Sequence, residues 1–144
     1  MRDLSLHILD ILDNCIAASA TRIEVTVEQD VSGNLLAIEV RDNGAGMDSE
    51  TLSRARDPFF TTRSGKRVGL GLPLFAQAAR EAGGEFSIQS EPGGGTRVHA
   101  SFRPSHPDCK PLGDIERTIE CIRASHPGIR LDYRHSTVGE GEGT

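Results

Sequence analysis

Two polar side chains lie one helical turn apart near the start of the chain. Asp10 and Asn14 are separated by four positions in an amphipathic stretch, so a helix would stack them on one face. An asparagine oxygen can bind a hard cation such as Mg²⁺, which takes few protein ligands besides the phosphates of its substrate. A carboxylate one turn away could orient or deprotonate a water or a hydroxyl group. Alternatively, both residues are ordinary polar side chains on the solvent-exposed face of an amphipathic helix, which is the commoner arrangement of such a pair.

A second cluster, Asp42-Asn43-Gly44-Ala45-Gly46-Met47, directly follows a segment of alternating apolar residues. A carboxylate fixed at the end of a strand can accept a hydrogen bond from an exocyclic amine, and glycines let a flat ring approach the backbone. Asn-Gly and Asp-x-Gly are also ordinary turn formers, and by itself this motif favours a turn.

The motif Gly69-Leu70-Gly71-Leu72 leads into a second helical pattern. Glycines before a helix N-terminus leave N–H groups and the positive end of the helix dipole available to a phosphate. The phosphate-loop pattern and the third glycine of a dinucleotide fingerprint are both absent, so the motif alone equally fits a loop or a cap. Arg63, Lys66 and Arg67, just before it, could clamp nucleotide phosphates or remain solvated.

The hydrophobic pattern predicts the elements that must position these residues. Residues 3–18 and 72–82 have the period of amphipathic helices. Four segments alternate apolar and polar side chains, at 22–28, 36–40, 86–88 and 98–102. Such alternation is typical of a sheet with one covered and one wet face. We therefore predict an α+β fold, a two-layer α/β sandwich in which a mixed, mostly antiparallel sheet has its helices on one face.

A change in composition after Pro104 predicts two parts of the chain. Residues 1–104 would form the main domain, in which residues 57–71 are a loop long enough to be either disordered or functional. Residues 105–144 would be an extension with a short helix over 113–124, a strand over 129–133 and a frayed end.

Composition narrows the class of protein. The chain has 144 residues, a formal charge of −5 and 36% hydrophobic residues, which suits one compact domain with a short appendage. No apolar run reaches the roughly 20 residues that span a bilayer, and the acidic balance argues against a nucleic-acid-coating protein. The three widely spaced cysteines form no disulfide framework. We expect a cytoplasmic protein with neither a membrane nor a nucleic acid as partner.

Taken in order, the motifs resemble the GHKL superfamily of ATPases. The series is Asn14, a strand, Asp42-x-Gly44-x-Gly46, Asp57-Pro-Phe-Phe-Thr-Thr-Arg63 and Gly69-Leu-Gly-Leu72, and the resemblance covers residues 3–104. This superfamily shares the Bergerat nucleotide-binding fold and includes histidine kinases, DNA gyrase, the MutL mismatch-repair proteins and the heat-shock chaperone. The resemblance implies the Bergerat fold and binding of ATP with Mg²⁺.

The resemblance also implies a role for each matching residue. Asn14 would coordinate the metal, Asp42 would bind the adenine amine, and Asp10 would occupy the position of the catalytic base. The other implied nucleotide-binding residues are Gly44, Gly46 and Met47 beside the ring, Phe59 and Phe60 before the lid, Arg63, Lys66 and Arg67 in the lid, Gly69, Leu70, Gly71 and Leu72 near the phosphates, and Thr96, which would complete the adenine site through a water.

The subtype signals disagree. The aromatic and glycine motifs look most like sensor histidine kinases, whereas residues 14–24 look closer to the MutL type. Family members that hydrolyse ATP have Glu where this chain has Asp10, and the shorter side chain puts its reach to the attacking water in question. A displacement of 1 Å at such a site can reduce the rate about a hundredfold. No histidine-bearing helical hairpin precedes residue 1, so we expect a stand-alone member, with His7 a structural or surface residue.

Two functions from different classes follow. The first is a kinase acting in trans on a partner protein, or a slow ATPase, in a regulatory system. The second is a non-catalytic nucleotide sensor or anti-sigma-like module in which ATP orders the lid; a vestigial pocket ranks lowest. The segment after residue 104 resembles small stand-alone ATP-binding proteins encoded beside iron-hydrogenase subunits, which implies a redox-linked partner. A homodimer stays open.

Overall fold

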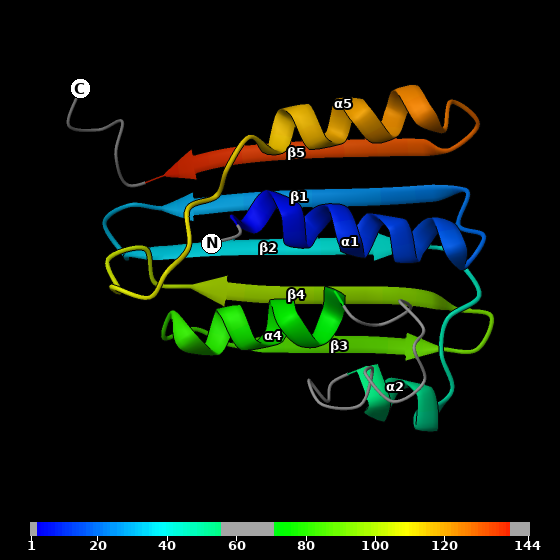
Figure 1. Ribbon diagram of the computed structural model, residues 1–144, viewed down its shortest axis with the longest axis horizontal. Coiled ribbons are helices and arrows are strands. Elements are labelled where there is room, and N and C mark those ends of the chain that lie inside the picture. Colours follow the sequence, from blue (N-terminus) through cyan, green and yellow to red (C-terminus); the bar gives the residue numbers. More distant parts are fainter. Residues whose placement is uncertain (1–2, 56–70, 139–144) are drawn as a thin grey trace.

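The computed structural model describes residues 3–55 and 71–138. Five strands form one mixed sheet in the order β3-β4-β2-β1-β5, shown in Figure 1. All neighbours pair antiparallel except β1 and β5, which are parallel. The strands are β1 (Arg22–Asp30), β2 (Leu35–Asp42), β3 (Phe86–Glu91), β4 (Gly95–Phe102) and β5 (Arg130–Val138).

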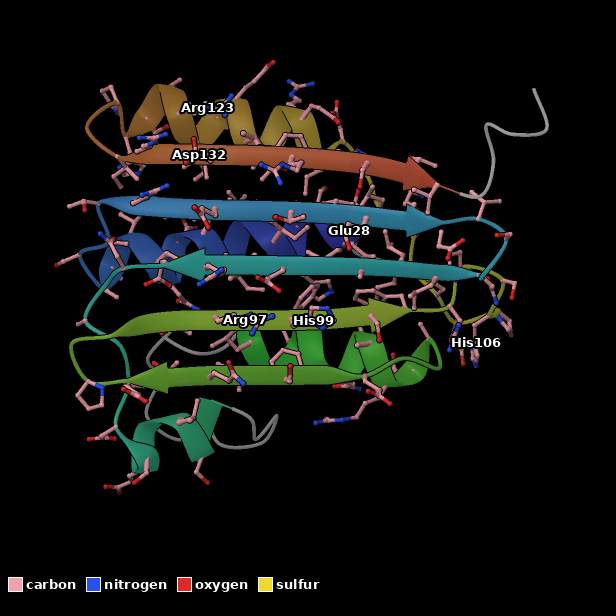
Figure 2. The ribbon with its side chains drawn as sticks, turned by 180° about the vertical axis from the view of Figure 1, so that it is seen from behind. Glu28, Arg97, His99, His106, Arg123 and Asp132 are labelled. Atoms are coloured by element: carbon pink, nitrogen blue, oxygen red, sulfur yellow. The ribbon has the colours of Figure 1, made fainter. Side chains whose placement is uncertain are left out.

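Three helices cover one face of this sheet. They are α1 (Leu4–Ala17), α4 (Gly71–Glu81) and α5 (Ile115–Ser125), while the short α2 (Ser49–Ala55) lies beyond the β3 edge in Figure 1. Figure 2 shows the opposite face, where the polar side chains of Glu28, Arg97 and His99 project from uncovered strands. The predicted two-layer α+β sandwich with helices on one face is confirmed. No helix in the described ranges has the length and apolar character needed to cross a membrane.

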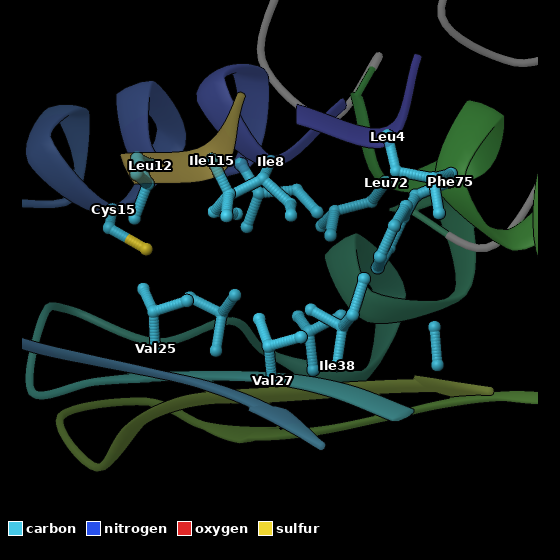
Figure 3. Close-up of a cluster of buried hydrophobic side chains, with 14 of the residues drawn as sticks. Leu4, Ile8, Leu12, Cys15, Val25, Val27, Ile38, Leu72, Phe75 and Ile115 are labelled. Atoms are coloured by element: carbon cyan, nitrogen blue, oxygen red, sulfur yellow. The ribbon is translucent and has the colours of Figure 1, made fainter. Parts of the chain in front are cut away.

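The core lies between the helices and the sheet. The inward residues of α1 include Leu4, Ile8 and Leu12, all fully buried, and they pack over Val25 and Val27 of β1 and Ile38 of β2 (Figure 3). This packing follows from the two sequence periods, since a helix repeats its apolar face every 3.6 residues and a strand every second residue.

The backbone N–H groups in the first turn of α1 donate hydrogen bonds to a segment that is distant in sequence. The Asp3 carboxylate caps the helix by accepting from the Leu6 N–H at 3.2 Å. The carbonyl oxygens of Pro111 and Leu112 accept from the N–H groups of Leu4 and Ser5 at 2.8 and 2.9 Å. Because the first four N–H groups of a helix have no partner inside it, these carbonyls satisfy donors that would otherwise be left open.

The segment after residue 104 is built into the same core. Strand β5 pairs with β1 along its whole length, with Ile23 opposite Leu131, and α5 buries Ile115 and Ile119. The strand predicted over 129–133 is longer in the structure, and its partner was not predicted. The boundary at residue 104 stays a prediction, but the segments on its two sides share one sheet and one core.

Candidate functional site

The loop after β2 is shaped by its own first residue. The Asp42 Oδ1 atom accepts a hydrogen bond from the Gly44 N–H at 2.7 Å, which closes a tight turn. The Ala45 N–H donates to the carbonyl of Ala18 at 2.9 Å, so the turn is fixed against the end of α1. A carboxylate at the C-terminal end of the central strand β2 is thus held next to the helix that contains Asn14.

Asn43 anchors the same loop from the other side. Its Oδ1 atom accepts from the backbone N–H groups of Thr21 and Arg22 at 2.9 and 3.0 Å, and its Nδ2 donates to the Thr21 hydroxyl at 2.9 Å. The role of Asn43 is therefore structural: it ties the loop to the start of β1.

The β3–β4 hairpin packs against this loop backbone to backbone. Gly46 has a φ of +72° and Gly95 a φ of +80°. A Cβ atom at Gly46 would overlap the carbonyl of Glu91, and one at Gly95 would overlap the carbonyl of Asp42. A hydrogen bond joins the hairpin to the loop: the Gly93 N–H donates to the Ala45 carbonyl at 2.6 Å. Only glycine allows this contact, so both positions define the shape of the site.

A cavity of about 270 Å³ opens where the loop, the hairpin and α1 meet. Its volume is near the lower end of ligand pockets, and a few polar groups in a largely apolar wall are typical of such sites. The polar side chains are Asn14, Asp42 and Thr96. The other lining residues are Ile11, Cys15, Ala17, Ala18, Val40, Ala45, Gly46, Met47, Leu72 and Val98.

The Asn14 amide contributes a buried polar nitrogen to the cavity wall. Its Nδ2 atom is buried and has no hydrogen-bond partner within the described residues. A buried polar group left unpaired costs about 1–3 kcal/mol. A ligand that presents a hydrogen-bond acceptor at this point would recover that free energy, and the amide oxygen beside it is a suitable ligand for a hard cation.

Cys15 lies beside Asp42 in the same cavity and is only 4% exposed. Burial raises the pKa of the thiol well above its ordinary value, and the charge of Asp42 and a hydrogen bond to it raise the pKa further. The side chain is therefore a protonated thiol at neutral pH.

Thr96 lines the cavity, and Ser90 lies beside it on the next strand, behind the cavity wall. Asp42, Thr96 and Ser90 are cross-strand neighbours on β2, β4 and β3. The Ser90 and Thr96 hydroxyl oxygens are 2.8 Å apart, and Ser90 also accepts from the Met47 N–H at 2.8 Å. Sequence reasoning missed Ser90. The available signal was its place in the alternation after Phe86 and Ile88, which puts a polar side chain at an inward position.

The structure brings together part of the predicted site. Asn14, Asp42, Gly46, Met47, Leu72 and Thr96 all line the cavity. Gly44 is buried against Ala18, and Gly71 is the first residue of α4. Phe59, Phe60, Arg63, Lys66, Arg67, Gly69 and Leu70 lie outside the described residues.

Two residues of α1 are placed differently from the rest of the site. Asp10 is half-buried one turn before Asn14, outside the residues that line the cavity. His7 is 4% exposed, with its ring centre 6.1 Å from that of Phe75 on α4. The burial of His7 and its contact with Phe75 agree with a structural role for this residue.

Residues 2–106 match a protein family described as "Histidine kinase-, DNA gyrase B-, and HSP90-like ATPase". The chain is 36% identical over 103 residues to a sensor protein of Shewanella frigidimarina, a match that covers 70% of this chain and 16% of that protein. It is 35% identical over 88 residues to sporulation kinase C of Bacillus subtilis, covering 61% of this chain and 20% of the kinase. The chain thus spans about a fifth or less of the length of these two relatives.

The fold also resembles a solved structure. The MutL ATPase domain of Aquifex aeolicus, complexed with ADP, superimposes with a TM-score of 0.57 at 16% identity. The superposition covers 94% of this chain and 60% of the MutL chain. At this level of identity the likeness concerns the fold, and it includes the segment after residue 104.

Proposed function

Since the chain belongs to the histidine kinase-, DNA gyrase B- and HSP90-like ATPases, we propose that it is a cytoplasmic, Mg²⁺-dependent ATP-binding protein of a regulatory system, acting as a kinase in trans or as a slow ATPase. The observation that supports the nucleotide site best is the convergence of Asn14, Asp42 and Thr96 on one cavity. The three side chains come from α1, β2 and β4, so the fold as a whole positions them.

The adenine ring would lie in the cavity beside Asp42. A carboxylate accepts hydrogen bonds only, which suits the exocyclic amine of adenine and disfavours a keto oxygen at the same position. The apolar side chains of Ile11, Met47 and Val98 would contact the ring. Gly46 adds no side chain to this wall, so a flat ring can approach the backbone.

Asn14 would hold the metal ion. Because Mg²⁺ takes few protein ligands besides the phosphates of its substrate, the remaining ligands would come from the phosphates and water. The ion would neutralise negative charge on the phosphates. The Nδ2 atom of Asn14, buried without a partner in the described part of the chain, would donate to an oxygen of the bound nucleotide.

Asp10 would orient or deprotonate the hydroxyl or water that attacks the terminal phosphate. Its place on α1, one turn from Asn14, puts it on the side of the site where the phosphates would lie. Its shorter side chain and its position outside the cavity lining support a second candidate function, a nucleotide sensor that binds ATP without turning it over.

Calorimetric titration with ATP, with and without Mg²⁺, tests the proposal. We expect Mg²⁺-dependent binding in the wild type and a loss of at least tenfold in affinity in Asp42→Asn, because the amide would present a donor to the adenine amine. Asp108→Asn is the matched control, since that carboxylate is exposed on a loop away from the cavity. Equal binding by all three proteins, or no binding at millimolar ATP, would contradict the proposed function.

A further inference from the structure

We propose that Ser90 is a positioning residue for nucleotide recognition, which ties the loop after β2 to β4 and fixes the direction of the hydrogen bond made by Thr96. The inference rests on the proposed nucleotide site. It assigns a role to a side chain that does not itself line the 270 Å³ cavity.

The Ser90 hydroxyl lies at the meeting point of three site segments. The Met47 N–H donates to its Oγ atom at 2.8 Å, the Gly95 carbonyl lies at 3.0 Å, and the Thr96 hydroxyl oxygen at 2.8 Å. Met47 and Thr96 both line the cavity, so a single side chain behind the wall contacts two residues that form it.

Counting protons fixes the direction of each hydrogen bond. A serine hydroxyl has one proton and two lone pairs, and a carbonyl oxygen can only accept. The Gly95 contact is therefore a hydrogen bond only if Ser90 donates to it. The Met47 N–H takes one lone pair of Ser90, and the proton of Thr96 must take the other. This is the one arrangement in which all three short contacts are hydrogen bonds.

The consequence is a cavity edge made of acceptors. With its proton directed to Ser90, the Thr96 hydroxyl presents only lone pairs to the cavity. Asp42, the cross-strand neighbour of Thr96, also accepts only. Two adjacent acceptors suit an exocyclic amine, which has two protons to donate, directly or through a water. A purine with a keto oxygen at that position would face two acceptors and lose both hydrogen bonds.

Ser90→Ala removes this constraint and, with it, the acceptor of the Met47 N–H. The Thr96 hydroxyl would then be free to turn its proton toward the cavity and donate to a keto oxygen. We expect the affinity for ATP to fall roughly tenfold, as the loss of one positioned hydrogen bond predicts. We expect the preference for ATP over inosine triphosphate, which has a keto oxygen in place of the amine, to fall by a further factor of about ten.

The test is a titration of four proteins with ATP and with inosine triphosphate, each in the presence of Mg²⁺. The proteins are the wild type, Ser90→Ala, Ser90→Thr and Ser87→Ala. Ser90→Thr restores the hydroxyl and should restore the preference. Ser87→Ala is the matched control, because Ser87 is exposed on the same strand and lies outside the cavity lining.

The preference ratio separates positioning from a merely structural role. A structural role would weaken the binding of both nucleotides equally, so an unchanged ratio in Ser90→Ala overturns the inference whatever happens to the affinities. The inference is also overturned if the wild type binds ATP but Ser90→Thr shows the same lowered preference for ATP over inosine triphosphate as Ser90→Ala. A wild type that binds neither nucleotide overturns the proposed function, and the role of Ser90 falls with it.

Discussion

Asp42 and Thr96 are direct cross-strand partners on β2 and β4, and both side chains line the same cavity. The register of this antiparallel pair, rather than any local sequence feature, brings a carboxylate and a hydroxyl to one edge of the site. Because the pleat repeats every two residues, a shift of one residue would turn one of the two side chains to the uncovered face. The strand register therefore controls the chemistry of the site.

Replacing Asn14 should separate stability from binding. Asn14→Ala removes a buried amide whose nitrogen has no partner within the described residues, so we expect the free energy of unfolding without nucleotide to rise by about 1 kcal/mol. The same variant should lose the dependence of ATP binding on Mg²⁺. Thermal unfolding and titration measure the two effects, and Asp13→Ala, at an exposed position of the same helix, is the control. A lower melting temperature in Asn14→Ala would contradict the prediction.

Asp10→Asn should distinguish the two candidate functions. If Asp10 acts as a base, release of ADP from ATP should fall about a hundredfold or more while ATP binding is kept. Asp13→Asn, which removes the same charge from an exposed position of α1, should leave turnover unchanged. Equal turnover in both variants would favour the sensor function, in which occupancy rather than hydrolysis carries the signal.

The glycines of the loop and the hairpin should differ sharply in tolerance to alanine. Gly46→Ala and Gly95→Ala each place a Cβ on a backbone carbonyl in addition to a positive φ, and we expect a loss of more than about 3 kcal/mol in folding free energy. At Gly93 the φ is +77°, but apart from its chain neighbours no described residue has an atom within 4 Å of the new Cβ, so Gly93→Ala should cost about 1 kcal/mol. Urea unfolding of the three variants gives the comparison. A ranking in which Gly93→Ala is as damaging as the other two would show that strain alone, and not contact, limits these positions.

The Cys15 thiol should be unreactive near neutral pH. Burial is the largest cause of its raised pKa, and the Asp42 carboxylate adds to it, so alkylation by iodoacetamide at pH 8 should modify the exposed Cys121 long before Cys15. Because the folded-state pKa is raised, the stability that this thiol contributes is present below its ordinary value of 9.0 and is lost as the pH rises above it. The wild type should therefore lose stability above pH 9 more steeply than Cys15→Ala. Mass spectrometry of the alkylated protein and unfolding curves across pH check both parts.

Much of the fold was predictable because its elements are strongly periodic. The second helical pattern, predicted over 72–82, occurs as Gly71–Glu81, and each alternating segment forms a strand. The helix α2 was not predicted, since seven residues give too short a window for a period, and its packing depends on Leu52 against the distant core.

The helical period alone does not determine the surroundings of His7. The sequence left it open whether this residue is structural or lies at the surface. In the structure α1 contacts α4 and α5 as well as the sheet, so a second strip of the helix is covered and His7 packs against Phe75. Which flank of a helix a neighbour covers is a tertiary choice that no local pattern contains.

The site itself was predictable only in part. The order of motifs singled out Asn14, Asp42 and Thr96, and in the structure the three line one cavity, while their roles stay predictions. Ser90 acts behind the wall through contacts that depend on the register of β3 with β4 and on the path of the loop at Met47. The alternation of β3 places Ser90 on the inward face, but it does not indicate which distant groups the hydroxyl contacts.

The hydrogen bonds from Leu4 and Ser5 to Pro111 and Leu112 have a consequence for how the protein is made. The helix that contains Asn14 is synthesised early, but the carbonyl oxygens at its N-terminus and the strand β5 beside β1 come from residues 111–138. A nascent chain that has emerged only as far as β4 thus has every side chain of the described cavity and still lacks the partners that fix α1. The helix that contains Asn14 therefore has its full set of partners only after residues 111–138 have been synthesised, which makes completion of the cavity a late event in folding.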